Sequence, residues 1–210
     1  MKKNLLVLAF LVGLLTCCKS EDAPIKPVKP TDPGSINKEY MSRAETTFAN
    51  IFKYYWSDKV RMMFGSYPNT LGTPQEPSSP DYDSHAYLWG LGSVVSAFNA
   101  IVQNTDNVDF RMTYESRLKE TLLKYYNTTK EPMCFGCFVN PHDQRLYDDA
   151  IWVGIDLADL YSKTKDSWYL DYAKSVWNFV LSGKDDELGG GVYWDENAKD
   201  SKNTCSNAPA

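Results

Sequence analysis

Apolar side chains along this sequence recur every three or four residues in several long segments, a spacing that places them on one side of a helix. In the first segment Phe48, Ile51 and Tyr55 lie on one stripe, which predicts a helix over about 37–56. The second segment, over about 85–102, is apolar on most sides, and we expect its helix to be deeply buried. The chain is therefore predicted to open with two packed helices.

Three further helices are predicted in the second half of the chain. Their apolar spacing places them over about 110–126, 148–163 and 167–182, and Gly183 fits the C-terminal cap of the last one. A strand-like pattern is found only at 191–194. The fold class is therefore predicted to be all-α, built from antiparallel helix pairs.

The N-terminus is interpreted as an export signal rather than as part of the fold. Two lysines precede an apolar run over 5–15, which is shorter than the roughly 20 residues of a membrane span. The run ends at a cysteine pair that resembles a bacterial lipobox, in which Cys18, or alternatively Cys17, becomes the lipid-modified N-terminus. We expect a lipoprotein signal peptide at 1–18 and a proline-rich tether at 19–36. An ordinary signal peptide with incidental cysteines is the alternative.

The composition is that of an ordinary globular protein with many aromatic rings. Hydrophobic residues make up 43% and charged residues 23%. Aromatic residues make up 14%, and their planes suit both a core and the C–H faces of sugars. The formal charge of -5 argues against nucleic acid as a partner, because proteins that bind it usually carry a basic face.

Three cysteines lie beyond the signal segment. Cys134 and Cys137 have the spacing of a metal or redox motif, but the chain has no second pair, and only His85 and His142 could assist. We therefore predict no metal site. In an oxidising envelope the pair can form a local disulfide, and two buried thiols are an equal alternative. The third cysteine, Cys205, stands alone.

Asp148 and Asp149 are the strongest candidates for catalytic chemistry, at the junction of a loop and a predicted helix. Glycoside hydrolysis needs two carboxyl groups beside the scissile bond, about 5–5.5 Å apart in retaining enzymes. Consecutive residues entering a helix point roughly 100° apart, which allows two short side chains to approach that separation. A helix N-terminus favours negative charge, whereas a neighbouring carboxylate raises the pKa of an acid catalyst. Taken alone, acidic residues at this position are more commonly helix caps.

The segments around this pair resemble the central signature of glycoside hydrolase family 76. The ordered runs YDDAIWVGIDLADLY, WYLDYAKSVWNFVLSG, DDELGGGVYWDE and SKNTCSNAPA over 146–210 carry the resemblance, and SHAYLWGLGSVVSAFNAI over 84–101 adds to it more weakly. The resemblance implies an (α/α)6 barrel, of which the roughly five predicted helices form only the first half. It also implies that Asp148 is the nucleophile and Asp149 the acid/base, with no metal and no organic cofactor.

Four residues near the pair are candidates for contact with the sugar. Tyr147 precedes it, and Trp152, four places beyond Asp148, is either a core residue or a wall beside the acid. Trp194, which follows a run of glycines, can face the cleft, and the amide of Asn207 can reach the substrate.

A second acidic pair, Asp185 and Asp186, competes for the catalytic role. It lies between a helix and the glycines at 189–191, which permit tight backbone turns. We interpret this pair as shaping the loop. Trp89 and Tyr82 are weaker candidates for the site.

The function expected from these features is that of a retaining endo-α-1,6-mannanase with α-mannan as its substrate. The lipobox predicts a lipid anchor in the envelope of a Gram-negative bacterium, on the outer-membrane surface or the periplasmic face. A mannan transglycosidase and a non-catalytic glycan-binding lipoprotein are the alternatives. The end of the sequence has the pattern of a sixth helix that is beginning, so 37–210 is expected to be an incomplete catalytic domain, poorly stable and inactive alone.

Overall fold

The structure is a computed structural model that describes residues 38–68, 85–139 and 144–210. The predicted signal peptide, the tether and both candidate lipidation cysteines lie outside these ranges, as do Tyr82 and His142. None of the helices within them has the length and the apolar character that crossing a membrane requires.

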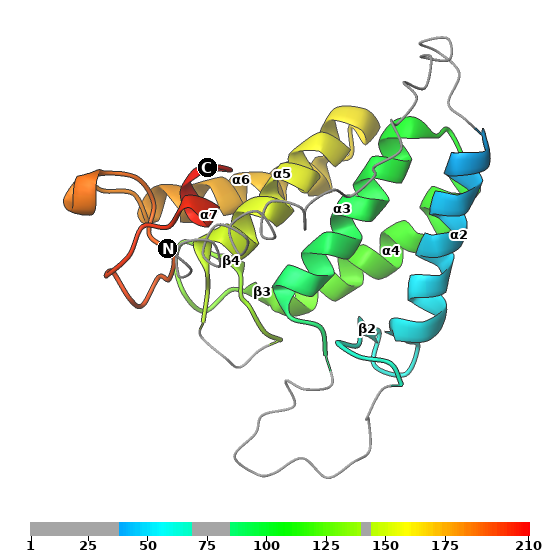
Figure 1. Cartoon of the computed structure of the whole chain (residues 1–210), viewed down its shortest axis with the longest axis horizontal. Helices are drawn as coiled ribbons and strands as arrows, with labels where there is room; N and C mark the ends of the chain where they lie inside the picture. Colours follow the sequence, from blue (N-terminus) through cyan, green and yellow to red (C-terminus); the bar gives the residue numbers. More distant parts are fainter. Residues whose placement is uncertain (1–37, 69–84, 140–143) are drawn as a thin grey trace, which may run out of the picture. The chain divides into compact units, whose positions relative to one another are not determined.

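Helices dominate the described residues, and all five predicted helices are present (Figure 1). Their bounds are α2 (Lys38–Tyr55), α3 (Leu88–Asn104), α4 (Val108–Tyr125), α5 (Tyr147–Thr164) and α6 (Ser167–Ser182), followed by the 3-10 turn η2 (Glu187–Gly189) and the short helix α7 (Thr204–Asn207). The predicted all-α class is confirmed. The short α7 begins where the sequence pattern predicted the start of a sixth helix.

Side-chain caps explain where α4 and α6 begin. The side chain of Asn107 accepts a hydrogen bond from the N–H of Phe110 at 3.1 Å, and Asp166 accepts one from Trp168 at 3.0 Å. At the end of α5, Lys165 adopts a left-handed conformation with φ of 60°, and its N–H closes the last turn. The chain therefore reverses within two residues, and α6 folds back along α5.

The helices α3 and α5 lie side by side and run in the same direction (Figure 1). The polar contacts between them pair residues that advance together along both helices. Asp156 of α5 accepts hydrogen bonds from Ser96 and, at 2.9 Å, from Asn99 of α3; further along, Gln103 donates to the carbonyl of Asp159 at 3.0 Å. Because the buried carboxylate of Asp156 needs these donors, they fix how the two helices are placed along each other.

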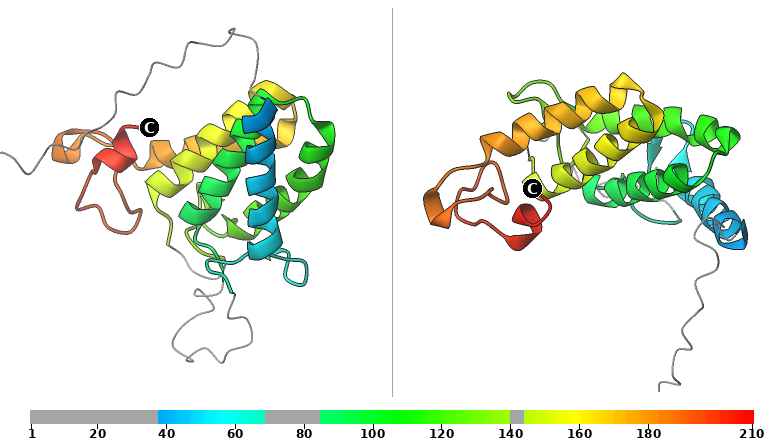
Figure 2. Two further views of the ribbon diagram at one scale, coloured as in Figure 1. Left: turned by 45° about the vertical axis from the view of Figure 1, so that its right-hand side comes forward. Right: turned by 90° about the horizontal axis from the view of Figure 1, so that it is seen from above.

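A second layer consists of α2, α4 and α6. Aromatic rings join α2 to α4, since the ring of Phe48 lies 5.3 Å from that of Phe110 and 5.1 Å from that of Tyr114. An ion pair of 2.6 Å between Lys119 and Asp166 joins α4 to α6. The helix α6 returns antiparallel along α5 (Figure 2), so the two layers share one apolar core.

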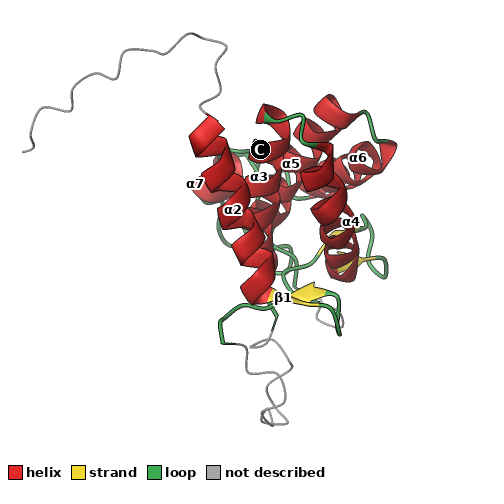
Figure 3. Cartoon of the chain, turned by 90° about the vertical axis from the view of Figure 1, so that its right-hand side faces the viewer, coloured by secondary structure: helices red, strands yellow, loops and turns green. Residues whose placement is uncertain are grey.

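Two small antiparallel hairpins lie at one end of the helices (Figure 3). They pair β1 (Trp56–Ser57) with β2 (Met62–Met63) and β3 (Tyr126–Asn127) with β4 (Cys134–Phe135). These hairpins were not predicted, because strands of two residues are too short to show an alternating pattern. The short strand-like pattern at 191–194 does not form a strand. The backbone there forms only an isolated bridge between Val192 and Lys184, because the preceding glycines, all with positive φ, turn the chain.

Gly183 is required by close packing rather than by a left-handed turn. It caps α6 with a φ of -89°, a conformation open to any residue, so the positive φ that commonly explains a glycine cap is absent. A Cβ at this position would lie 2.5 Å from Cε1 of Tyr147, whose buried ring stacks on Phe179 with 4.4 Å between centroids. The ring of the first residue of α5 therefore fills the space that a side chain at 183 would need.

We expect Gly183→Ala to lower the free energy of unfolding by roughly 1–3 kcal/mol, because the new methyl group overlaps a ring that cannot move away. Gly90→Ala is the matched control. Its Cβ would meet nothing nearer than the Cβ of Ala86 at 3.9 Å, so this change should be neutral or stabilise by up to about 1 kcal/mol. Urea unfolding measures both variants, and equal stability of the two would contradict the packing argument.

Candidate active site

Asp148 and Asp149 lie in the first turn of α5, and both are largely buried, with exposures of 8% and 9%. Neither caps the helix, because the N-cap residue is Leu146, which makes no side-chain cap hydrogen bond. The first N–H of the helix, that of Tyr147, donates instead to the carbonyl of Trp194 at 3.0 Å. Burying two adjacent carboxyl groups costs free energy. Because neither residue caps the helix, the capping alternative does not explain why both are buried here.

The pKa of Asp149 is raised from its ordinary value of 3.8 to about 6. The main cause is burial, which removes the carboxylate from water, and the adjacent charge of Asp148 adds to it. The nearby thiol of Cys137 acts in the opposite direction and favours the ionised form of Asp149. The helix N-terminus favours negative charge, but burial outweighs it. A carboxyl group with this pKa can both give and take a proton near neutral pH, as a general acid/base must.

Asp148 has different neighbours. Its Oδ1 accepts the backbone N–H of Asp149 at 3.0 Å. Cys205 lies near it on α7, a helix that packs against α5, and the pKa of this thiol is raised by burial and by Asp148. Each member of the pair therefore has one cysteine thiol near it, Cys205 for the first and Cys137 for the second.

A small cavity of about 90 Å³ opens beside Asp149, between α3 and α5. It is lined by Trp89, Ser93 and Ser96 of α3 and by Trp152 of α5. The two indole side chains are 56% and 42% exposed. Of the two alternatives for Trp152, its exposure and its place beside the acid favour the wall over the core. An acid between exposed aromatic planes can present its proton to a sugar that rests on them.

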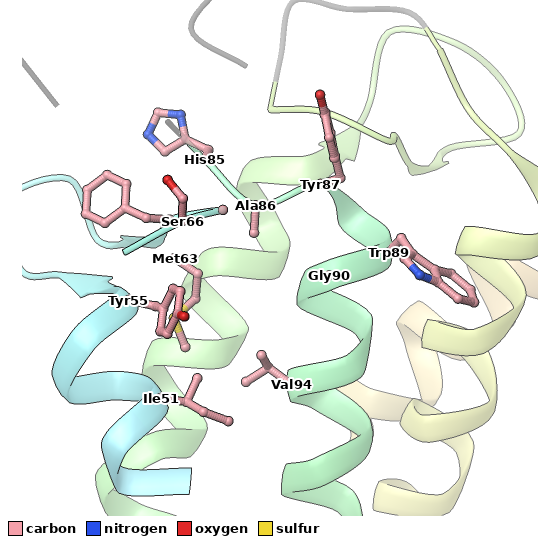
Figure 4. Close-up of a pocket in the computed structure, with 12 residues that line it drawn as sticks. Ile51, Tyr55, Met63, Ser66, His85, Ala86, Tyr87, Trp89, Gly90 and Val94 are labelled. Atoms are coloured by element: carbon pink, nitrogen blue, oxygen red, sulfur yellow. The ribbon is translucent and has the colours of Figure 1, made fainter. Parts of the chain in front are cut away.

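A larger hollow of about 540 Å³ lies between α2 and α3 (Figure 4). Its walls are mostly apolar, with Ile51 and Tyr55 on α2 and Val94 on α3, and the described residues that line it include no carboxylate. Trp89 lines both spaces, and Figure 4 shows its ring turned away from Ile51. Of these two spaces, only the smaller has a carboxyl group among the described residues that line it, so we place the candidate site there.

Tyr147 and Trp194 adjoin the pair but differ in exposure. Tyr147 is 2% exposed and lies in the packing of α5 on α6, stacked on Phe179, so its ring offers no surface to a sugar. Trp194 is 36% exposed and is held next to the start of α5 by its backbone carbonyl, which accepts from Tyr147, and by its N–H, which donates to Ser201 at 3.1 Å. Of these two rings, only that of Trp194 remains accessible.

The amide of Asn207 is engaged with the backbone rather than turned outward. Its Oδ1 accepts the N–H of Val192 at 2.7 Å, and its Nδ2 donates to the carbonyls of Val192 at 2.8 Å and Asn203 at 2.9 Å. Gly191, with φ of +88°, approaches so closely that a Cβ there would lie 3.1 Å from Cγ of Asn207. The amide thus fixes the glycine turn to α7, the helix that carries Cys205.

Asp185 organises the loop that follows α6, in agreement with the loop-shaping interpretation. Its carboxylate pairs with Lys202 at 2.6 Å and accepts hydrogen bonds from the hydroxyl of Tyr193 at 3.0 Å and the N–H of Glu187 at 3.1 Å. The pKa of Asp185 is lowered, above all by the hydrogen bond from Lys202. Its neighbour Asp186 is exposed to solvent.

Arg145, which the sequence did not single out, anchors the segment that leads into α5. Its side chain is fully buried, pairs with Glu196 through two hydrogen bonds (Nε to Oε2 at 2.8 Å), and lies over the ring of Phe179 at 4.7 Å. Nη1 also donates to the carbonyls of Lys130 at 3.1 Å and Pro132 at 2.7 Å. Burial is the largest single influence on the pKa of Glu196 and acts to raise it, but the hydrogen bonds and charges of Arg145 and Lys130 together outweigh burial, and the pKa is lowered. A single arginine in a loop has no periodic signal that could have revealed this role.

Cys134 and Cys137 are both buried free thiols, the second of the two alternatives considered for them. Burial raises the pKa of Cys134 to about 12, and burial together with the charge of Asp149 raises the pKa of Cys137. Within the described part of the chain, no group of three metal-ligating side chains comes together.

Comparison with known protein families matches residues 39–210 to Glycosyl hydrolase family 76. No curated protein matches. Three similar solved structures are a family 76 glycoside hydrolase (mannosidase) from Bacteroides thetaiotaomicron, another family 76 glycoside hydrolase from a bovine strain of that species, and a family 76 α-1,6-mannanase from Salegentibacter sp. HEL1_6.

These structures share the arrangement of helices seen in this chain. The first is 24% identical, with a TM-score of 0.66, and the match covers 81% of this chain and 46% of that chain. The second is 29% identical, with a TM-score of 0.63 and coverages of 80% and 36%. The third is 20% identical, with a TM-score of 0.58 and coverages of 81% and 43%. The chain therefore spans less than half the length of each of these structures.

The neighbours are (α/α)6 barrels, in which helices of an inner and an outer layer alternate along the sequence. The described helices alternate in the same way, with α3, α5 and α7 in one layer and α2, α4 and α6 in the other, and they form part of such a barrel. Because the family match extends over 39–210, most of the sequence, this chain belongs to glycoside hydrolase family 76.

Proposed function

We propose that this chain carries the catalytic carboxylates of a retaining endo-α-1,6-mannanase that acts on α-mannan. The observation that carries the proposal is the buried pair Asp148 and Asp149 at the start of α5, where Asp149 has a pKa of about 6 and faces a cavity walled by Trp89 and Trp152. The neighbour from Salegentibacter supports the choice of substrate. An inactive variant of that α-1,6-mannanase, with two consecutive aspartates replaced by alanine, is in complex with α-1,6-mannotetrose.

In the proposed reaction the two carboxyl groups act in two displacements. Asp148 attacks the anomeric carbon, the glycosidic C–O bond breaks, and the leaving oxygen takes the proton of Asp149. A water then attacks the same carbon, its proton passes to the ionised Asp149, and Asp148 leaves. The sugar therefore retains its configuration, and both carboxyl groups return to their starting states.

The same proposal includes a lipid anchor in the envelope of a Gram-negative bacterium. Its support is the lipobox-like segment at Cys17 and Cys18, which the proline-rich stretch at 19–36 separates from the helices. A glycan-binding lipoprotein without activity is less well supported, because binding alone does not require two buried, adjacent carboxyl groups.

We expect Asp148→Asn and Asp149→Asn each to lower the rate of α-1,6-mannan hydrolysis by roughly 100-fold or more, because one removes the nucleophile and the other the proton donor. Release of reducing ends from unbranched α-1,6-mannan by the full protein measures the loss, and NMR of the first product tests retention. Asp186→Asn is the matched control, since this exposed aspartate makes the same charge change outside the cavity. Normal turnover in either variant of the pair would refute the assignment.

The pH dependence of hydrolysis should follow the proton of Asp149. Because the first displacement needs the protonated acid, kcat/KM is expected to fall as the pH rises through about 6. A pH–rate profile on a soluble mannooligosaccharide measures this limb. A rate that continues to rise between pH 6 and 8 would be inconsistent with Asp149 as the acid.

The free energy of unfolding also depends on the protonation of Asp149, and it can be measured without any substrate. The pKa of Asp149 is raised in the folded protein, so the stabilisation from its proton is complete below about pH 4 and is lost as the pH rises through about 6. We expect Asp149→Asn, which resembles the protonated form, to avoid a loss on the order of 2–3 kcal/mol between pH 4 and 7. Urea unfolding at both pH values compares it with wild type and with Asp186→Asn, and parallel curves for all three would count against the raised pKa.

A further inference from the structure

The small cavity beside Asp149 cannot enclose a sugar ring. Its volume of about 90 Å³ is roughly three times the ~30 Å³ that one water molecule occupies in the liquid. Sites that enclose a whole small molecule typically have volumes of roughly 300 Å³ or more. The cavity therefore has room for only a few non-hydrogen atoms next to the carboxyl group of Asp149.

Gly92 of α3 leaves part of this space open. The residue is buried within the helix and lines the cavity. Outside its two chain neighbours and the backbone of its own helix, a Cβ at this position would have one neighbour within 4 Å, Cγ2 of Val153 on α5, at 3.7 Å. This is an ordinary van der Waals distance, so a methyl group at 92 would fit between the helices and would reduce the cavity.

Helix packing does not account for this glycine. Glycine in the interior of a helix is less stable than alanine, so a helix that keeps one commonly does so to allow a close approach. Gly154 of α5 is such a case, since a Cβ there would lie 2.7 Å from Cγ1 of Val176 on α6. Gly92 has no comparable neighbour. What its missing side chain preserves is the space beside Asp149.

The two serines in the wall of the cavity use their hydroxyl hydrogens elsewhere. Ser93 donates to the carbonyl of Trp89 at 3.3 Å, and Ser96 donates to the carboxylate of Asp156. A serine hydroxyl has only one hydrogen to donate. Neither serine therefore offers a proton to an oxygen in the cavity, which leaves that role to the carboxyl group of Asp149.

The linkage of the proposed substrate matches a cavity of this size. In an α-1,6 bond the oxygen that receives the proton is O6 of the leaving mannose, and the methylene C6 separates it from the sugar ring. In a 1,2, 1,3 or 1,4 bond the same oxygen is attached directly to a ring carbon. Only the C6–O6 arm can therefore enter the cavity while the ring stays outside, against the exposed indoles of Trp89 and Trp152.

We propose that the small cavity receives the C6–O6 arm of the leaving mannose and that Gly92, by keeping the cavity open, determines the preference for α-1,6 bonds. The inference rests on the proposed function and adds the residue that selects the linkage. The arm brings O6 to the carboxyl group of Asp149, which donates the proton, and the leaving ring packs on the indoles. A bond through a ring carbon would place the ring itself in the cavity, where it does not fit.

The test is Gly92→Ala, with Gly90→Ala as the matched control. Both changes add one methyl group to α3, and alanine favours a helix, so both variants are expected to fold. Gly90 is exposed and lines the larger hollow instead of the small cavity. Circular dichroism and thermal unfolding of the full protein verify that each variant is folded before its activity is compared.

Two substrates separate the leaving sugar from the rest of the reaction. On α-1,6-mannotetraose, Gly92→Ala should lower kcat/KM by roughly 10- to 100-fold, because the methyl group occupies the space of the arm. On α-1,6-mannobiosyl fluoride, in which a fluoride ion leaves in place of the sugar, the same variant should lie within about 2-fold of wild type. Gly90→Ala should match wild type on both. An equal loss on both substrates, or no loss on the tetraose, would overturn the inference.

The linkage preference of the wild-type protein is the second measurement. Its kcat/KM on α-1,6-linked mannooligosaccharides should exceed that on the α-1,2- and α-1,3-linked isomers by at least about 100-fold, and Gly92→Ala should narrow this ratio. A ratio that Gly92→Ala leaves unchanged would count against selection by the cavity. Activity of the wild type on the fluoride alone would retain the catalytic pair and refute the role of the cavity. If neither the tetraose nor the fluoride is hydrolysed, the proposed function itself fails, and the inference fails with it.

Discussion

The buried ion pair between Arg145 and Glu196 connects three segments that would otherwise be independent loops. The guanidinium reaches the carbonyls of Lys130 and Pro132 in the β3–β4 hairpin, the carboxylate belongs to the loop after η2, and the arginine itself lies just before α5. Removing one partner of such a pair leaves an uncompensated buried charge, which typically costs about 3–5 kcal/mol. The arrangement of the candidate site therefore depends on an ion pair whose two residues do not line the small cavity.

The pair Asp148 and Asp149 shows how one turn of helix gives two identical side chains different surroundings. Successive residues on a helix are rotated by about 100°, so the two carboxyl groups point to different neighbours. One lies near Cys205 of α7, and the other lies near α3, the small cavity and Cys137. A division of labour between two chemically identical residues needs this kind of asymmetry, and here the backbone geometry supplies it.

The helices were predictable because each buries one continuous stripe, and the ends of α4 and α6 follow from short polar caps. The interest of the acidic pair came only from the ordered motifs around it, since composition and spacing alone favour a helix cap. The groups that surround the two aspartates were not predictable, because their positions depend on contacts between segments that are distant in the sequence. Tyr147 is adjacent to the pair in sequence but packs on α6, and the amide of Asn207 binds the backbone of Val192. The direction in which a side chain points across a packed interface does not change the local spacing of apolar residues, so the sequence pattern does not reveal it.

The polar contact between α3 and α5 has a consequence for which substitutions the site can tolerate. Asp156 lies two turns of helix beyond Asp149, and its hydrogen bonds to Ser96 and Asn99 allow only one relative placement of the two helices. A slide by a single residue would move Trp89 about 1.5 Å relative to Asp149, with which it lines the small cavity. Substitutions at these interior polar positions would thus alter the placement of the two helices at Asp149, roughly 10 Å away along α5.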